Sequence, residues 1–228
     1  MTRRTFLAAS PALAQPPARK LRIAFLGAAH SHAAEKIRVV QASPAWVLAG
    51  IVESSPAVRA PFEKAGIPIL TREAVLKDDT IEVVAVESEV KPHAADGLAA
   101  LNAGKHVHLE KPPSLNRDDM RALLDAARRK QRLLQMGYMW RHHAGMHRLI
   151  EAARQKWLGD IYLVRGTMNT LIGADRRPEW NLFSGGHMFE QGGHLLDPIV
   201  RMLGMPVKIS PFLRSDGDFQ DGLKDNTA

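Results

Sequence analysis

The chain has 228 residues, of which 45% are hydrophobic and 24% are charged, a composition typical of a soluble globular protein. Its formal net charge is +7, but the basic residues form short runs without interleaved aromatic residues, so we expect no nucleic-acid partner. The sequence contains no cysteine, which excludes disulfides, thiolate metal sites and a cysteine nucleophile.

The first 20 residues are predicted to lie outside the fold. Arg3 and Arg4 precede an apolar run that ends in the small-x-small sequence Ala12-Leu13-Ala14. This pattern is typical of a twin-arginine export signal, which would carry the folded protein to the periplasm without membrane insertion. The alternative is the basic amino terminus of a cytoplasmic protein.

Apolar runs alternate with helical patterns from residue 21 to about residue 139. The predicted strands are 21–26, 46–52, 67–69, 81–86, the stretch within 103–112, and 133–137. The predicted helices are 33–42, 56–65, 93–103 and 117–130, the last with Asn116 as its N-cap. Six strands separated by helices predict an α/β fold with a doubly wound parallel sheet.

The alternation changes after residue 140. Helices are predicted at 144–157 and 190–204, strands at 160–170 and 207–213, and an irregular loop at 176–186. Residues 140–228 therefore predict an incomplete α+β domain with an open sheet edge.

Lys111 stands just before Pro112, where a short predicted strand ends. Open α/β sheets bind their ligands at the carboxyl ends of the strands. Lys111 is therefore the first candidate for chemistry.

Two motifs carry a family resemblance: Ala103 to Val107 (AGKHV) with Glu110-Lys111-Pro112, and Glu190 to His194 (EQGGH). The chain resembles the Gfo/Idh/MocA family of glucose-fructose oxidoreductases and inositol dehydrogenases, and it looks truncated at the carboxyl terminus. The resemblance implies a Rossmann domain over 21–139 that binds NAD or NADP. It also implies that 140–228 are part of a substrate domain, whose open sheet would form a homo-oligomer contact when the domain is complete.

The predicted cofactor site begins at a turn after the first strand. The turn retains only the first glycine of the G-x-G-x-x-G pattern, and its residues are Gly27, Ala28, Ala29, His30, Ser31 and His32. Glu53 is placed to accept hydrogen bonds from the ribose, and Ser54-Ser55 offers no arginine for a 2'-phosphate, which favours NAD over NADP.

Further cofactor-binding residues are predicted around the later strand ends: Glu87, His93, Glu110 and Lys111. The carboxylates of Glu87 and Glu89 should repel a pyrophosphate unless they turn away.

His30 and His32 also form a His-x-His pair, as found in metal-dependent amidohydrolases. Their closed barrel needs roughly 250 residues, and the predicted strands do not form one. We therefore expect no metal, and we expect the pair to line the nucleotide cleft.

The resemblance also implies the catalytic residues. Lys111 would place a positive charge near the developing alkoxide, His194 would act as general base, and Glu190 would orient the imidazole of His194. Glu190 replaces the usual aspartate of the family. Asp197-Pro198 could also begin a helix, which leaves open whether one helix runs through His194.

Substrate contacts are predicted for Arg141, His142, Trp180 and His194. Together these features indicate an NAD(P)-dependent oxidoreductase for a small-molecule sugar, cyclitol or related polyol. Three alternatives remain open: an NAD-dependent glycosidase or lyase of the same family, a non-catalytic nucleotide- or sugar-binding protein, and a metal-dependent hydrolase.

Overall fold

The computed structural model describes residues 19–228, so the predicted export signal lies outside the described residues. Five parallel strands form one sheet in the order β2-β1-β3-β4-β5. They are β1 (Leu21–Leu26), β2 (Trp46–Val52), β3 (Val83–Val86), β4 (His106–Leu109) and β5 (Leu134–Met136). This confirms the predicted α/β fold class. The strand expected at 67–69 is reduced to a single bridge between Ile51 and Ile69, where Pro68 lacks an N–H for a longer ladder.

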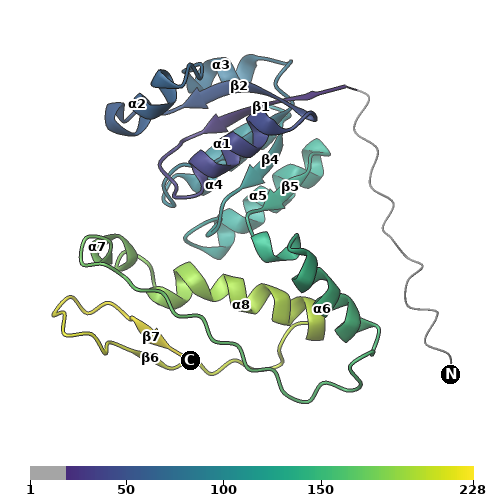
Figure 1. Ribbon diagram of the computed structural model, residues 1–228, viewed down its shortest axis with the longest axis vertical. Coiled ribbons are helices and arrows are strands. Elements are labelled where there is room, and N and C mark those ends of the chain that lie inside the picture. Colours follow the sequence, from purple (N-terminus) through teal and green to yellow (C-terminus); the bar gives the residue numbers. More distant parts are fainter. Residues whose placement is uncertain (1–18) are drawn as a thin grey trace.

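Helices cover both faces of the sheet (Figure 1). One hydrophobic core lies on each face. On one face, α1 (Ala33–Ala42) and α2 (Pro56–Lys64) pack against Ile23, Phe25 and Ile51. On the other, α3 (Arg72–Lys77), α4 (His93–Asn102) and α5 (Arg117–Lys130) pack against Leu26, Val84 and Leu109. The helices fix where each strand ends, and therefore where the loops that follow the strands meet.

Side-chain caps set the starts of several helices. The Asn116 side chain accepts a hydrogen bond from the amide of Asp119 at 2.9 Å, as predicted. Thr71 caps α3 in the same way, through the amide of Ala74 at 3.1 Å. The sequence prediction missed this six-residue helix, although Thr71 is a typical N-cap residue.

The C-terminal region, residues 138–228, lies below the sheet region, residues 21–137, in Figure 1. Its elements are η1 (Met139–Arg141), α6 (Ala144–Arg154), α7 (Arg177–Trp180), α8 (His187–Leu203), β6 (Leu213–Arg214) and β7 (Asn226–Thr227). Helix α8 runs unbroken through Asp197 and Pro198, so Asp197 is not a helix cap. Helix α7 occupies part of the segment predicted as an irregular loop.

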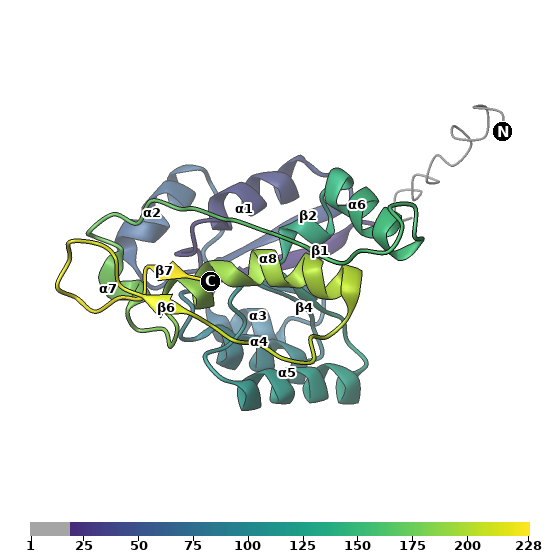
Figure 2. The same cartoon turned by 90° about the horizontal axis from the view of Figure 1, so that it is seen from below.

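Both strands predicted in the C-terminal region differ from the structure. Residues 160–170 are extended but form no strand, and they run beside α8 in both views (Figures 1 and 2). The strand predicted at 207–213 is reduced to β6, which pairs antiparallel with β7. An extended segment becomes a strand only when a neighbouring segment pairs with its backbone N–H and C=O groups. Of the two predicted strands, both of which lie in the described residues, only the part that forms β6 has such a partner, which is β7.

None of the helices within residues 19–228 combines the length and hydrophobicity that a membrane span requires.

Candidate active site

A buried ion pair joins the sheet region to α8. Lys111 follows β4, and its Nζ donates to Glu190 Oε1 at 2.5 Å and to the Glu190 carbonyl oxygen at 3.4 Å. Both side chains are more than nine-tenths buried. Glu190 Oε2 is also buried and has no hydrogen-bond partner among the described residues. One carboxylate oxygen is thus committed to the lysine, and the other is available to a ligand.

His194 lies one helical turn after Glu190 on α8. We expected Glu190 to orient the His194 imidazole, but the structure shows Glu190 bonded to Lys111 and no hydrogen bond to His194 in its described part. The His194 ring lies 6.2 Å from the Trp140 ring, centroid to centroid. Burial, followed by the charge of Lys111, lowers the pKa of His194. The imidazole is therefore neutral near pH 7.

These side chains line one small cavity of about 200 Å³. Its other walls come from the turn after β1, from η1, from residues 168–176 and from α7, so residues distant in the sequence meet there. Its lining includes Ser31, His32, Lys111, Trp180, Glu190 and His194. Sequence reasoning singled out all six.

Trp180, a predicted substrate residue, is buried in this wall. Its ring stacks on that of His187 with centroids 5.5 Å apart, and Arg176 lies 5.7 Å from its ring centre. Trp180 Nε1 is buried without a hydrogen-bond partner in the described part of the chain. Together with Glu190 Oε2, it leaves one donor and one acceptor unsatisfied in side chains that line the cavity.

Arg141 and His142, the other predicted substrate residues, do not line this cavity. Arg141 Nε donates to both carboxylate oxygens of Asp197 at 2.9 Å, which ties η1 to α8. His142 is exposed and contacts Gln135 at 3.2 Å. Arg141 is therefore occupied by a structural ion pair. Asp197 can accept from Arg141 because it lies within α8 and does not cap a helix.

The turn after β1 and Glu53 together line a second cavity, of about 360 Å³. Glu53 Oε2 accepts from the amide of Ala28 at 2.9 Å, and its Oε1 accepts from the amide of Ser55 at 2.8 Å. Gly27 has φ +82°, and a Cβ there would lie 2.3 Å from the Ser88 Cα. The turn thus retains the tight glycine conformation and the acid at the end of β2, and these residues fit the adenosine half of a dinucleotide.

Glu87, expected at the cofactor, is fully buried and turned away. Lys36 Nζ on α1 donates to Glu87 Oε1 at 2.6 Å. Burial raises the pKa of Glu87 to about 7, although Lys36 opposes this. The predicted repulsion of a pyrophosphate therefore does not involve Glu87, whereas Glu89 does line the Glu53 cavity.

Glu110 is the centre of a buried network below the His32 ring. Its Oε1 accepts from Lys36 Nζ at 2.6 Å and contacts His32 Nδ1 at 2.9 Å, and its Oε2 accepts from the amide of Lys111 at 2.5 Å. Burial acts to raise the pKa of Glu110, but the hydrogen bonds from His32 and Lys36 hold it well below its usual range. Gly137 leaves room for the carboxylate, since a Cβ there would lie 2.7 Å from Oε2. Glu110 is thus an anchor for the site rather than a residue exposed to the cofactor.

Lys36 was missed by sequence reasoning. It follows His32, the N-cap of α1, by four residues, and this spacing brings the two side chains to the same side of the helix start. A lysine in an amphipathic helix is usually exposed, so only the carboxylates of Glu87 and Glu110 explain its position.

His93 and His30 are also more buried than expected for cofactor contacts. The two ring nitrogens of His93 lie 2.9 Å from the Ser88 carbonyl oxygen and 2.8 Å from that of Pro112. This links the loop after β3 to the loop after β4. Burial lowers the pKa of His30 to about 3, so this ring is neutral.

Two groups of side chains have the ligand types and the spacing that a metal ion would need. The ligand atoms of His30, His32 and Glu110 lie within 4.8 Å of one another, as do those of Glu87, His108 and Glu110. Lys36 Nζ lies 2.6 Å from the two carboxylates and 2.8 Å from His108 Nε2 in the second group. An ammonium ion thus takes the central position there, and in the first group His32 Nδ1 is already bonded to Glu110.

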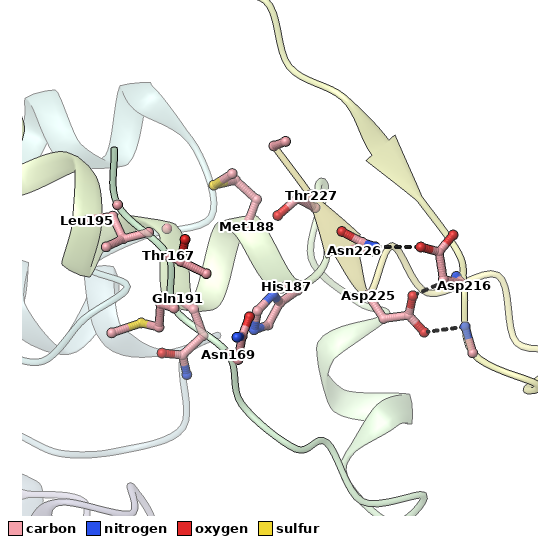
Figure 3. Close-up of a pocket in the computed structure, with 15 residues that line it drawn as sticks. Thr167, Asn169, His187, Met188, Gln191, Leu195, Asp216, Asp225, Asn226 and Thr227 are labelled. Atoms are coloured by element: carbon pink, nitrogen blue, oxygen red, sulfur yellow. Dashed lines mark hydrogen bonds between the residues drawn. The ribbon is translucent and has the colours of Figure 1, made fainter. Parts of the chain in front are cut away.

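A larger cavity, of about 670 Å³, lies on another face of α8 (Figure 3). It is bounded by residues 166–169, α8 and the segment around β7, and Asp225 bonds to the amide of Asp216 at its rim. It contains neither Lys111 nor His194. The cavity of about 200 Å³ is the better candidate active site, because the Glu190 carboxylate, the His194 imidazole and the Lys111 ammonium converge there.

A parallel sheet with a glycine turn after β1 and an acid at the end of β2 defines a dinucleotide-binding Rossmann protein. Residues 21–138 match the Gfo/Idh/MocA family, described as an oxidoreductase family with an NAD-binding Rossmann fold. The chain therefore belongs to this family, as the resemblance predicted.

Two curated relatives and one solved structure illustrate the match. D-glucoside 3-dehydrogenase of Escherichia coli (strain K12) is 31% identical over 131 residues, covering 55% of this chain and 36% of the relative. Inositol 2-dehydrogenase of Salmonella typhimurium (strain LT2) is 30% identical over 93 residues, covering 40% and 28%. A crystal structure of an NAD-binding protein from Listeria innocua has a TM-score of 0.71 at 25% identity, covering 86% of this chain and 59% of that one. The chain thus spans only about a third of the length of these curated relatives.

Proposed function

We propose that this chain is an NAD(P)-dependent oxidoreductase that transfers hydride between the nicotinamide cofactor and a sugar, cyclitol or related polyol. One observation carries the proposal: a single loop lines both cavities. Gly27 and Ala29 face the cavity that holds Glu53, and Ser31 and His32 face the cavity that holds Lys111 and His194. A dinucleotide bound along this loop would extend from the Glu53 cavity toward Lys111 and His194.

The chain's own groups suit alcohol oxidation. Bound NAD(P) would supply the hydride acceptor. The Lys111 ammonium supplies positive charge for an oxygen that becomes more negative as its proton leaves. His194 is the second group that we place at the reacting hydroxyl, because it faces the same small cavity.

The unsatisfied polar atoms favour a hydroxylated substrate. Glu190 Oε2 can accept a hydrogen bond from a hydroxyl, and Trp180 Nε1 can donate one. A buried polar atom without a partner costs about 1–3 kcal/mol, which a polyol hydroxyl would remove. The named activities of the glucoside and inositol dehydrogenase relatives support the same substrate class.

We propose NAD rather than NADP as the preferred cofactor. Glu53 would accept hydrogen bonds from the ribose and repel a 2'-phosphate. Arg72 lines the same cavity, but its Nη2 is paired with Asp96 at 3.1 Å. Export to the periplasm also belongs to this proposal, as does homo-oligomer formation through the C-terminal sheet when that domain is complete.

Hydride transfer can be tested directly. The protein is incubated with NAD or NADP and a panel of sugars and cyclitols, and nicotinamide absorbance is followed. We expect reduction of NAD by at least one polyol and its loss in Lys111→Ala. Dinucleotide binding without reduction by any polyol would instead support a non-catalytic binding protein, and full activity in Lys111→Ala would remove the role given to Lys111.

A further inference from the structure

The wall of the candidate active site carries a positive charge that oxidation of a neutral polyol does not require. Apart from its histidines, three residues that line the cavity of about 200 Å³ are ionised at neutral pH: Lys111, Arg176 and Glu190. Lys111 and Glu190 form a buried ion pair with each other, at 2.5 Å. Their charges offset one another, and Arg176 remains as an extra cation on the wall.

The partner that Arg176 has in the protein is easily displaced. Within residues 19–228, its one ion pair joins Nη2 to Glu179 Oε2 at 3.4 Å, and the two side chains are 48% and 50% exposed. Glu179 does not line the cavity. Exposed ion pairs contribute little, because water screens the charges and the long side chains lose freedom. An anion bound inside the cavity would be screened less and would compete with Glu179 for the guanidinium.

The neighbouring arginine shows what a committed guanidinium looks like in this region. Arg177 is buried and does not line the cavity. Its Nε donates to Asp221 Oδ2 at 2.6 Å, and its Nη2 donates to Asp225 Oδ2 at 3.1 Å. Arg177 therefore holds the C-terminal segment in place, whereas Arg176 is left to face the cavity.

Arg176 lies at the more open end of the cavity. Its guanidinium carbon is 5.7 Å from the ring centre of Trp180, a buried residue of the same wall. Lys111 and His194 are each only 5% exposed, so they form the buried end. A substrate that fills the cavity would thus present its reacting hydroxyl to Lys111 and His194 and a different part of the molecule to Arg176.

The size and charge of the cavity favour a carboxylate on a single sugar ring. A volume of about 200 Å³ is below the roughly 300–1,000 Å³ of pockets for drug-sized ligands, so it suits one ring with a small substituent. The planar fork of a guanidinium matches a carboxylate with two parallel hydrogen bonds. One extra cation balances one negative charge. A phosphate monoester carries about two negative charges at neutral pH, and the second would be unbalanced in a cavity that already contains Glu190.

We propose that Arg176 determines substrate specificity by binding the carboxylate of an acidic sugar, such as a uronic acid, while a ring hydroxyl is oxidised at Lys111 and His194. The inference rests on the proposed function, and it narrows the substrate class from polyols in general to polyols that carry a carboxylate. The carboxylate is bound and not changed. The hydride passes to NAD(P) and the proton to a base of the site from the carbinol alone, which becomes a ketone.

Matched pairs of sugars test this specificity. The rate of NAD reduction is measured with D-glucuronate and D-glucose, and with D-galacturonate and D-galactose, since the members of each pair differ in one carboxylate. For at least one pair, we expect kcat/KM to be about tenfold higher or more for the acid. Arg176→Gln should remove this preference by slowing the acid and leaving the neutral sugar within about twofold. Arg176→Lys should keep part of it, because an ammonium retains the charge but not the planar fork.

Arg165→Gln is a matched control, since Arg165 is exposed and lies outside the cavity. It should leave both rates unchanged. Neutral sugars that react as well as the acids, or a preference for acids that persists in Arg176→Gln, would overturn the inference alone. A higher kcat/KM for glucose 6-phosphate than for glucuronate would overturn the assignment of a carboxylate. No reduction of NAD or NADP by any of these sugars would overturn the proposed function.

Calorimetric titration in the presence of NADH measures binding of the acid without turnover, because the reduced cofactor cannot accept a hydride. Glucuronate or galacturonate should bind about tenfold more weakly to Arg176→Gln than to the wild type. Equal affinity in the two proteins would overturn the inference. Binding of the acid that depends on Arg176, in a protein that reduces neither NAD nor NADP, would support the anion site and overturn only hydride transfer.

Discussion

The sheet region and the C-terminal region contrast in how their backbones are held. In residues 21–137, each strand pairs along its length, and two hydrophobic cores enclose the sheet. In residues 138–228, long extended segments lack strand partners, and apolar side chains such as Tyr162 and Leu171 are 97% and 98% exposed. One small cluster that includes Trp180, Phe183 and Leu223 holds α7 and the segment before β7 together.

The candidate active site is divided between these two regions. Lys111 and His32 come from the sheet region, where several neighbours fix their positions, and Glu190 and His194 come from α8. The Glu53 cavity lies wholly within the sheet region. We therefore expect cofactor binding to be robust and catalysis to depend on how α8 is held.

The largest expected effect concerns the ion pair that joins the regions. Lys111→Met would leave the Glu190 carboxylate buried with neither oxygen paired, at a cost of about 3–5 kcal/mol in the free energy of unfolding. The double variant Lys111→Met/Glu190→Met should be less destabilised than this single one, because it buries no lone charge. Urea unfolding of the three variants measures this, and purely additive losses would contradict a coupled pair.

Gly27 tests how tightly the sheet region is packed. Gly27→Ala should destabilise by at least about 3 kcal/mol, because its Cβ would lie 2.3 Å from Ser88 at a positive φ. Gly66 is a matched control with φ +73°, where an added Cβ would have no atom within 4 Å, so Gly66→Ala should cost only about 1–2 kcal/mol. Equal losses in urea unfolding would mean that backbone strain, and not the contact, dominates.

Glu87 should give the sheet region a pH-dependent stability. Burial raises its pKa from an ordinary 4.5 to about 7. The folded state therefore holds this proton more tightly than the unfolded chain does, so the stability that Glu87 contributes is fully present below pH 4.5 and is lost as pH rises through 7. At about 1.4 kcal/mol per pKa unit, the loss is about 3 kcal/mol.

Glu87→Gln should reduce the change in the free energy of unfolding between pH 4.5 and pH 7, as measured by urea unfolding. Glu110 is shifted in the opposite direction, so its contribution is lost as pH falls below its unfolded pKa of 4.5, outside the range in which the contribution of Glu87 is lost. An unchanged pH profile in Glu87→Gln would contradict the assignment.

The smallest effects compare an ordered cap with an exposed apolar residue. Asn116→Ala removes the cap of α5 and should cost about 1 kcal/mol. Leu171→Ser, at a side chain that is almost fully exposed, should change the free energy of unfolding by less than about 0.5 kcal/mol. A larger loss for Leu171→Ser in thermal or urea unfolding would show that the C-terminal region is packed more closely than the exposure of this side chain indicates.

The sheet region was largely predictable because its signals are local. Continuous apolar runs such as 83–86 are typical of strands buried on both faces, and most helix starts carry a capping residue. The predicted strand at 160–170 was wrong because alternation shows that a segment can form a strand but does not supply a partner. Ile69 shows the same limit, since Pro68 restricts its pairing to one bridge.

The sequence predicted which residues form the site better than it predicted their contacts. The motif residues Lys111, Glu190 and His194 meet in one cavity, but the sequence could not show that Glu190 bonds to Lys111 rather than to His194. Partners of long side chains depend on rotamers and on burial, which no spacing rule specifies. Lys36 was missed for this reason.

Calorimetric titration tests most directly whether the turn after β1 binds a dinucleotide. Titration of the wild type with NAD should show one site per chain. Glu53→Ala, which removes the carboxylate at that cavity, should bind about tenfold more weakly, corresponding to the loss of about 1.4 kcal/mol for hydrogen bonds to the ribose. Absence of binding to both NAD and NADP, or equal affinity in Glu53→Ala, would contradict the account.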